Sequence, residues 1–324
     1  MLDARRTPFP RARMEKAMFQ GCGTALVTPF RSDLSLDEEG LRRLVRRQIE
    51  GGIHFLVPCG TTGENPTLTR EEHLRVVEIT LEEAKGKKTP VLAGCGGNNT
   101  REVVELARDL EGLGADGLLV VTPFYNKPTP EGLYQHYREV ARATRLPIVV
   151  YNVPGRTGLN VEPATLKRLA EIETVVGVKE ASGNISQIAA IFQMVPESFA
   201  VLSGDDAITL PVIALGGVGV ISVVSNEVPY AMARLTSLCL EGDFPAAREM
   251  QRRLHPLMEI NFIESNPGPA KAALGLMGLI EPILRLPAVP PRTESLKKIE
   301  KVLLELGLIP ETPESEPLEA QLAV

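Results

Sequence analysis

Several residues that could take part in catalysis stand directly after short apolar runs of this 324-residue sequence. The clearest is Lys179, which follows the run Val175–Val178. Short β-branched runs without polar alternation are typical of strands buried on both faces of a parallel sheet. A lysine at the inner end of such a strand either reaches out to water, as most strand-end lysines do, or is held neutral for chemistry.

The neighbouring residue types favour chemistry on a ketone. A desolvated lysine has a lowered pKa, so its neutral amine can attack a carbonyl and form a Schiff base. The iminium then lets a neighbouring carbon lose a proton, which calls for a shuttle such as Tyr151, one unit earlier in the chain. Hydroxyl and turn N–H groups of Thr61-Thr62-Gly63 suit the carboxylate of a 2-oxo acid, and Arg156 suits a second anionic substrate.

Each candidate also has a structural interpretation. Thr61-x-x-Glu64 matches a capping box, and Asp205-Asp206 is most simply a helix N-cap, since an acidic pair alone is weak support for Mg²⁺. Tyr125 and Tyr151 could be packing residues with a hydroxyl at the rim, and an arginine in a Pro/Gly loop is usually solvated. Each of these interpretations is favoured separately, but the joint placement of the residues at one mouth is harder to obtain by chance.

A repeated unit of strand, loop and amphipathic helix must position these residues. The predicted strands are Thr24–Val27, Phe55–Pro58, Val91–Ala93, Gly117–Val121, Ile148–Tyr151, Val175–Val178, Ala200–Leu202 and Val218–Ser222. Eight such units predict an α/β fold, a (β/α)8 TIM barrel, in which reacting groups lie at the carboxyl ends of the strands. A doubly wound sheet would carry G-x-G-x-x-G after its first strand, where this chain has Thr28-Pro29-Phe30.

Beyond the barrel the sequence predicts a C-terminal helical domain. We expect a disordered N-terminal extension at 1–18, the barrel catalytic domain at 19–242, the helical domain at 243–309 and a disordered tail at 310–324. The helices of the third part are predicted at Ala246–Leu257, Pro269–Leu279 and Thr293–Leu306. Thr69-x-x-Glu72 and Thr129-Pro130 predict the starts of two barrel helices.

Composition excludes several classes of function. A net charge of −6, 4% aromatic residues and no tryptophan give no support for a nucleic-acid partner. The four histidines and four cysteines show no metal-ligand spacing and no C-x-x-C pair, so we expect no metal and reduced thiols. The longest apolar region, Val212–Val224, is interrupted by glycines and too short for a membrane span. We therefore expect a cytoplasmic protein without a membrane partner.

Three motifs resemble those of the dihydrodipicolinate synthase family, within the class I pyruvate-dependent aldolases. They are Gly60–Glu64, Tyr151–Gly158 and Gly177–Asn184, in the family's order and spacing, and the resemblance extends from about Gly21 to Ile309. It implies a lyase that condenses pyruvate with L-aspartate 4-semialdehyde to 4-hydroxy-tetrahydrodipicolinate, on the way to diaminopimelate and lysine. It also implies no cofactor beyond the imine of pyruvate with Lys179.

The resemblance further implies roles for individual residues. Lys179 would form the Schiff base, and Tyr151 would be the proton donor and acceptor, linked through the Thr61 hydroxyl to Tyr125. In the family this last tyrosine enters from a neighbouring subunit, so we expect a homo-oligomer with a dimer as the minimum active unit, arranged as a tetramer of two dimers. The remaining site residues would bind substrate: Thr62 and the backbone of Ile221 on pyruvate, Gly204 along the wall, and Arg156 on the semialdehyde carboxylate.

Family members often bind lysine as a feedback inhibitor at the dimer interface. Matching positions here are His73, Asn98 and Glu102. However, Arg70 stands where the lysine-sensitive pattern has histidine, Phe124 where it has tyrosine, and Pro66 where it has a small residue. Since Phe124 lacks a hydroxyl and Arg70 would repel an ammonium group, we expect weak or absent inhibition by lysine.

Two alternatives remain open on the sequence. Sister aldolases acting on 2-keto-3-deoxy sugar acids, N-acetylneuraminate or 4-hydroxy-2-oxoglutarate share the lysine, the tyrosine and much of the threonine turn. Arg156-Thr157-Gly158 favours the synthase, because the neuraminate branch usually lacks arginine there. The other alternative is a non-catalytic barrel that binds pyruvate, which no residue of the chain favours.

Overall fold

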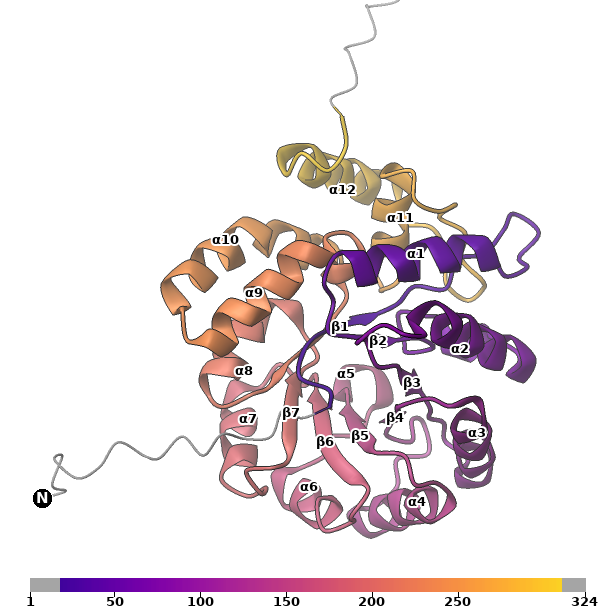
Figure 1. Cartoon of the computed structure of the whole chain (residues 1–324), viewed down its shortest axis with the longest axis vertical. Coiled ribbons are helices and arrows are strands. Elements are labelled where there is room, and N and C mark those ends of the chain that lie inside the picture. The colour runs from indigo at the N-terminus through magenta and orange to yellow at the C-terminus, as the bar shows by residue number, and fades with distance from the viewer. Residues whose placement is uncertain (1–17, 311–324) are drawn as a thin grey trace, which may run out of the picture.

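The computed structural model describes residues 18–310 and contains one sheet of eight parallel strands with helices outside it (Figure 1). The strands are β1 Gly21–Ala25, β2 Phe55–Val57, β3 Leu92–Gly94, β4 Gly117–Val121, β5 Ile148–Asn152, β6 Val175–Glu180, β7 Ala200–Ser203 and β8 Gly219–Ser222. Their order is β2-β1-β8-β7-β6-β5-β4-β3. A bridge between Leu56 and Val91 joins the two edges, so the predicted TIM barrel is confirmed.

Helices surround the strands, and two of them begin where the sequence predicted a helix start. The helices are α1 Glu38–Glu50, α2 Arg70–Ala84, α3 Thr100–Leu113, α4 Pro130–Ala143, α5 Pro154–Thr157, α6 Pro163–Leu169, α7 Ile185–Phe192, α8 Thr209–Ala214 and α9 Pro229–Glu241, with short 3-10 turns η1 Asn65–Thr67, η2 Asp206–Ile208 and η3 Val224–Asn226. The predicted capping box is confirmed, because Thr69 and Glu72 each accept from the other's backbone. Thr129 caps α4 in front of Pro130, also as predicted.

The first strand starts three residues earlier than predicted, at Gly21. Glycines are poor strand formers, so the sequence pattern placed the strand later. Here Gly21 pairs with Gly219 of β8, and a Cβ on Gly219 would lie 1.9 Å from the Gly21 carbonyl oxygen. The absence of side chains at this pair is therefore what allows β1 and β8 to approach.

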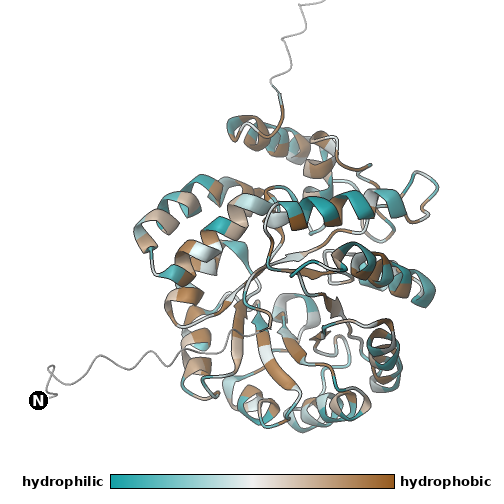
Figure 2. Cartoon of the chain, viewed as in Figure 1, coloured by the Kyte–Doolittle hydropathy of each residue, from teal (hydrophilic) through white to brown (hydrophobic). Residues whose placement is uncertain are grey.

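Two apolar layers hold the barrel together. One fills the interior and includes Phe55, Leu92, Val149 and Leu202; the other lies between the strands and the helices. Figure 2 shows mostly apolar strands and helices that alternate between apolar and polar faces. Strands buried on both faces explain why their sequences read as continuous apolar runs.

Helices α10 Phe244–Ile260, α11 Gly268–Leu276 and α12 Thr293–Glu305 follow the barrel. α10 packs on α9, and α12 packs on both α10 and α11. Within residues 18–310 no helix combines the length and apolarity needed to cross a bilayer. Apart from residues 18 and 310, the predictions of disorder for 1–18 and 310–324 concern residues outside the described part.

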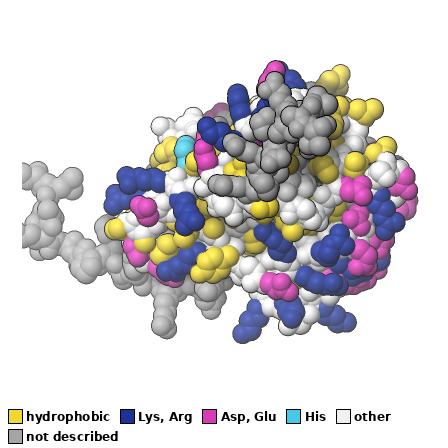
Figure 3. Space-filling view, turned by 90° about the horizontal axis from the view of Figure 1, so that it is seen from above, with side chains coloured by type: hydrophobic (Ala, Val, Ile, Leu, Met, Phe, Trp, Pro, Cys, Tyr) yellow, Lys and Arg dark blue, Asp and Glu magenta, His cyan; other side chains and the backbone are white. Residues whose placement is uncertain are grey.

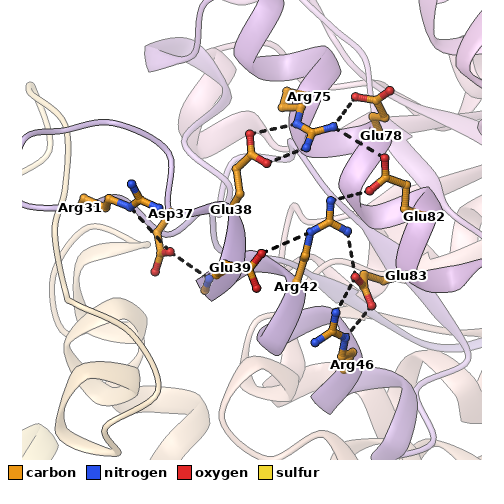
Figure 4. A network of polar contacts seen from close by, with 11 residues as sticks. Arg31, Asp37, Glu38, Glu39, Arg42, Arg46, Arg75, Glu78, Glu82 and Glu83 are labelled. Atoms are coloured by element: carbon orange, nitrogen blue, oxygen red, sulfur yellow. Dashed lines mark hydrogen bonds and ion pairs between the residues drawn. The ribbon is translucent and has the colours of Figure 1, made fainter.

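Charged side chains of both signs are interspersed on the face seen in Figure 3. Ion pairs between arginines and glutamates connect α1 to α2, as Figure 4 shows. In that network Arg42 contacts Glu83 at 2.9 Å, and Arg46 contacts the same carboxylate at 2.6 Å.

Candidate active site

Lys179 and Tyr151 face each other inside the carboxyl end of the barrel. They are paired in register on neighbouring strands β6 and β5. Lys179 is only 5% exposed, and its Nζ lies 4.3 Å from the centroid of the Tyr151 ring. The solvated strand-end interpretation of this lysine is therefore wrong: the side chain is buried against the predicted proton shuttle.

A cavity of about 240 Å³ opens beside Tyr151, whereas Lys179 is not among its described lining residues. Its described lining combines residues from several strand ends: Cys59, Gly60, Thr61, Asn65, Pro66, Gly94, Cys95, Gly96, Leu119, Val121, Phe124, Tyr151, Val153, Arg156 and Thr157. Thr61, Tyr151 and Arg156 are thus brought to one mouth, as predicted. Apolar walls with a few polar groups are typical of sites for small molecules.

The threonine turn after β2 is tightly folded. Gly63 N donates to Gly60 O at 3.1 Å, and Glu64 N donates to Thr61 O at 3.1 Å. Thr62 is 3% exposed, and its Oγ1 accepts a hydrogen bond from Asn266 Nδ2 at 3.0 Å. The capping-box interpretation of Thr61-x-x-Glu64 is wrong, because the Glu64 carboxylate binds Lys271 instead.

Arg156 lies at the entrance on the short helix α5. Its Nη2 donates to Asn266 O at 3.2 Å, and its side chain is exposed. Asn266 thus contacts both Thr62 and Arg156, a role that sequence reasoning missed. The Asn-Pro-Gly-Pro run at 266–269 signals a loop, but a loop signal does not say which strand ends the loop contacts.

The other predicted site residues are not part of the described cavity lining. Gly204 is half-buried, and its N–H donates to Glu180 O at 2.8 Å; Ile221 is fully buried in the barrel interior. Tyr125 is 89% exposed and, among the described residues, is not part of the cavity lining. Its own subunit therefore does not bring its hydroxyl to the cavity.

The acidic pair after β7 has a structural role. Asp205 caps η2 by accepting from Ala207 N at 2.9 Å, as the simplest interpretation predicted. Asp206 is buried and accepts from Val223 N and Val224 N at 2.9 and 3.2 Å, while its burial raises the pKa of its carboxyl group. Within residues 18–310, no group of three or more His, Cys, Asp or Glu side chains could hold a metal ion.

Three residues at the candidate lysine-binding positions, Arg70, His73 and Glu102, line a second hollow of about 310 Å³, whereas Asn98 is not among its described lining residues. His73 is buried, its Nε2 is 2.9 Å from Gly94 O, and burial lowers its pKa to about 4. Arg70 is paired with Asp109 at 2.5 Å. The exposed Asn98 accepts from Asn126 through its backbone carbonyl at 2.8 Å.

The fold and the site define a (β/α)8 barrel that binds small molecules at the carboxyl ends of its strands. The chain belongs to the Dihydrodipicolinate synthetase family, whose model matches residues 18–306. A 4-hydroxy-tetrahydrodipicolinate synthase of Koribacter versatilis is 50% identical over 90% of this chain and 97% of its own.

Solved structures agree with this assignment. The dihydrodipicolinate synthase of Thermotoga maritima superposes with a TM-score of 0.88 at 48% identity, over 90% of this chain and 100% of its own. That of Acinetobacter baumannii, complexed with pyruvate, gives 0.88 at 42% identity, over 90% of this chain and 99% of its own. The chain is therefore an enzyme with 4-hydroxy-tetrahydrodipicolinate synthase activity, a lyase of lysine biosynthesis. The synthase activity is therefore preferred to the two alternatives left open by the sequence, a sister aldolase and a non-catalytic barrel.

Proposed function

We propose that Lys179 carries the reaction by forming an imine with pyruvate. Its neutral amine attacks the C2 carbonyl, water leaves, and the iminium draws electrons from C3 as that carbon loses a proton. The resulting enamine attacks the aldehyde carbon of L-aspartate 4-semialdehyde, forming the new C–C bond. The observation that carries the proposal is the burial of Lys179 against Tyr151, which itself lines the cavity. The pyruvate complex of the Acinetobacter relative supports the choice of keto acid.

Tyr151 is proposed as the proton donor and acceptor, with Thr61 linking it to Tyr125. Both Tyr151 and Thr61 line the cavity, whereas Tyr125 of the same chain is exposed. That difference supports a site in which Tyr125 comes from a neighbouring subunit. The proposed assembly is a dimer as the minimum active unit, with two dimers in a tetramer, in the cytoplasm.

Substrate binding is assigned to polar groups around the same mouth. Because the Thr62 oxygen accepts from Asn266, its own O–H is free to donate to the pyruvate carboxylate. The backbone of Ile221 and the wall at Gly204 complete the pyruvate site. Arg156 at the entrance is proposed to bind the carboxylate of the semialdehyde through its guanidinium.

Inhibition by lysine is proposed to be weak or absent. The hollow that contains His73 and Glu102 also contains Arg70, whose charge opposes an ammonium group. Initial rates with millimolar lysine test this point, and strong inhibition would contradict it.

Borohydride trapping tests the proposed lysine directly. Wild-type protein incubated with pyruvate and borohydride is expected to gain one reduced pyruvate adduct on Lys179, located by peptide mass spectrometry. Lys179→Ala is expected to fold normally, gain no adduct and lose turnover by several orders of magnitude, as roughly expected for removal of a covalent nucleophile. An adduct on another lysine, or near-wild-type turnover of the variant, would contradict the proposal.

A further inference from the structure

A second buried lysine lies behind the threonine turn. Lys271 of α11 is 0% exposed and forms an ion pair with Glu64, which is 3% exposed in its side chain. The same ammonium group donates to Ile283 O at 2.7 Å and lies 4.2 Å from the centroid of the Phe30 ring. The proposed reaction uses neither member of this pair.

Both oxygens of the Glu64 carboxylate are bound by the C-terminal helical part. Oε1 contacts Lys271, and Oε2 accepts from Arg285 N at 3.1 Å. Arg285 is itself fixed, because its guanidinium donates to both carboxylate oxygens of Glu72 at 2.6 Å. A buried carboxylate with this many charged and polar partners has little freedom to move.

The backbone that carries Glu64 is the end of the threonine turn. Glu64 has a φ of 54°, a left-handed conformation that is strained for a residue with a side chain. Its N–H closes the turn on Thr61 O, and Thr62 is bound by Asn266, five residues before Lys271. The segment around α11 therefore holds the turn at two points, one neutral and one ionic.

We propose that Glu64 and Lys271 are positioning residues that fix the Thr62 hydroxyl for binding of the keto-acid carboxylate and the Thr61 hydroxyl for its link to Tyr151. This inference rests on the roles proposed above for the threonine turn. The ion pair holds the strained backbone of Glu64, so the two hydroxyls are ordered before pyruvate enters. Such pre-organisation lowers the cost of binding, and misplacement by about 1 Å can lower catalysis about a hundredfold.

The test replaces both members together, as Glu64→Gln with Lys271→Met. Removing one partner alone would leave an uncompensated buried charge, whereas replacing the whole pair by neutral side chains is often tolerated. The double variant is expected to stay folded by circular dichroism and thermal melting. Its kcat/KM for pyruvate is expected to fall about ten- to a hundredfold, mainly through KM, with a smaller change in the KM for aspartate semialdehyde.

The matched control is another ion pair, whose residues are not part of the described cavity lining. Arg42→Met with Glu83→Gln removes the half-buried pair between α1 and α2 shown in Figure 4, and its kinetics are expected to equal wild type. Glu64→Asp supplies a conservative variant, which keeps the charge but shortens the arm, and is expected to raise the pyruvate KM less than the double variant.

The outcomes separate this inference from the proposed function. If wild type traps pyruvate on Lys179 and the folded double variant keeps the pyruvate KM within twofold, the positioning role is overturned while the imine chemistry stands. If wild type gains no adduct on Lys179, the proposed function itself fails. Should the double variant not fold, an unchanged pyruvate KM in Glu64→Asp overturns the inference. If neither variant folds, the pair serves the fold alone and the inference is likewise rejected.

Discussion

The two buried lysines of this enzyme, Lys179 and Lys271, have different surroundings, and we assign them different roles. Lys271 has a carboxylate partner and a backbone acceptor, so its ammonium form is bound in place; burial nevertheless lowers its pKa to about 8. Lys179 lies over the ring of Tyr151, and Tyr151 lines the cavity.

Tyr151 offers a prediction at the level of a single hydroxyl. Tyr151→Phe is expected to lower kcat about a hundred- to ten-thousandfold, the usual contribution of a positioned acid or base, while the protein melts as wild type does. Steady-state kinetics and a thermal melt measure the two effects. Loss of less than tenfold in kcat would remove Tyr151 from its proposed role.

Tyr137 provides a control in the same barrel. Its hydroxyl donates to Val120 O at 2.8 Å, and the residue is fully buried. Tyr137→Phe removes one buried hydrogen bond without touching the cavity lining. It is expected to lower the free energy of unfolding by about 1 kcal/mol and to leave kcat unchanged.

At the scale of the elements, strand ends were predictable and the C-terminal contacts were not. The apolar run before Lys179 fixes the strand, and parallel strands bring their carboxyl ends to one mouth, so Tyr151 and Arg156 could be placed with it. Sequence patterns over a few residues do not predict which distant loop a helix near the C-terminus will contact. Asn266 and Lys271 therefore became visible only in the structure, across more than two hundred residues of chain from Thr62 and Glu64.

The junction of β8, η3 and α9 yields a pH prediction. Glu227 is fully buried there, and burial, with a smaller contribution from the charge of Asp206, raises its pKa from 4.5 to about 8. Between these values the unfolded chain is ionised while the folded protein holds its proton. The free energy of unfolding therefore falls as pH rises from 4.5 to 8, and the penalty is fully present above that range.

Glu227→Gln removes this titration and is expected to flatten the dependence. The variant should match wild type below about pH 4 and be more stable at pH 8 by on the order of a few kcal/mol, since each pKa unit corresponds to about 1.4 kcal/mol. Thermal or urea unfolding at both pH values measures the difference. The exposed Glu281→Gln is the control; equal slopes for wild type and Glu227→Gln would refute the assignment.

At the scale of the whole molecule, the position of Tyr125 bears on whether one subunit supplies every residue of its active site. The cavity is lined by Thr61 and Tyr151 of the same chain, yet Tyr125 is exposed on the segment 122–129 between β4 and α4, here called the rim loop. Its backbone is held in a left-handed conformation, with a φ of 71°. Such strain is costly for a non-glycine residue and is often found at functional positions. An exposed tyrosine in a fixed conformation is suited to contact a second subunit.

Mixed oligomers test whether the Tyr125 that acts at a site belongs to the same subunit or to the neighbouring one. Lys179→Ala and Tyr125→Phe chains, each inactive or impaired alone, are co-expressed with different tags and the mixed assemblies are purified. If Tyr125 acts across a two-fold interface, one site of each mixed dimer has an intact lysine and an intact tyrosine. Activity should then return to about half of wild type per dimer, because an isologous pair exchanges the same residue in both directions.

The control pairs Lys179→Ala with Tyr151→Phe. The centroid of the Tyr151 ring lies 4.3 Å from Lys179 Nζ within one barrel, so every mixed dimer keeps a defect in each site and activity should stay low. Recovery in the Tyr125 mixture but not in the Tyr151 mixture requires that the tyrosine cross the interface. Failure of the Tyr125 mixture to recover, with mixed dimers verified by mass, would mean that each subunit works with its own tyrosine, and the rim loop would have to turn inward when substrate binds.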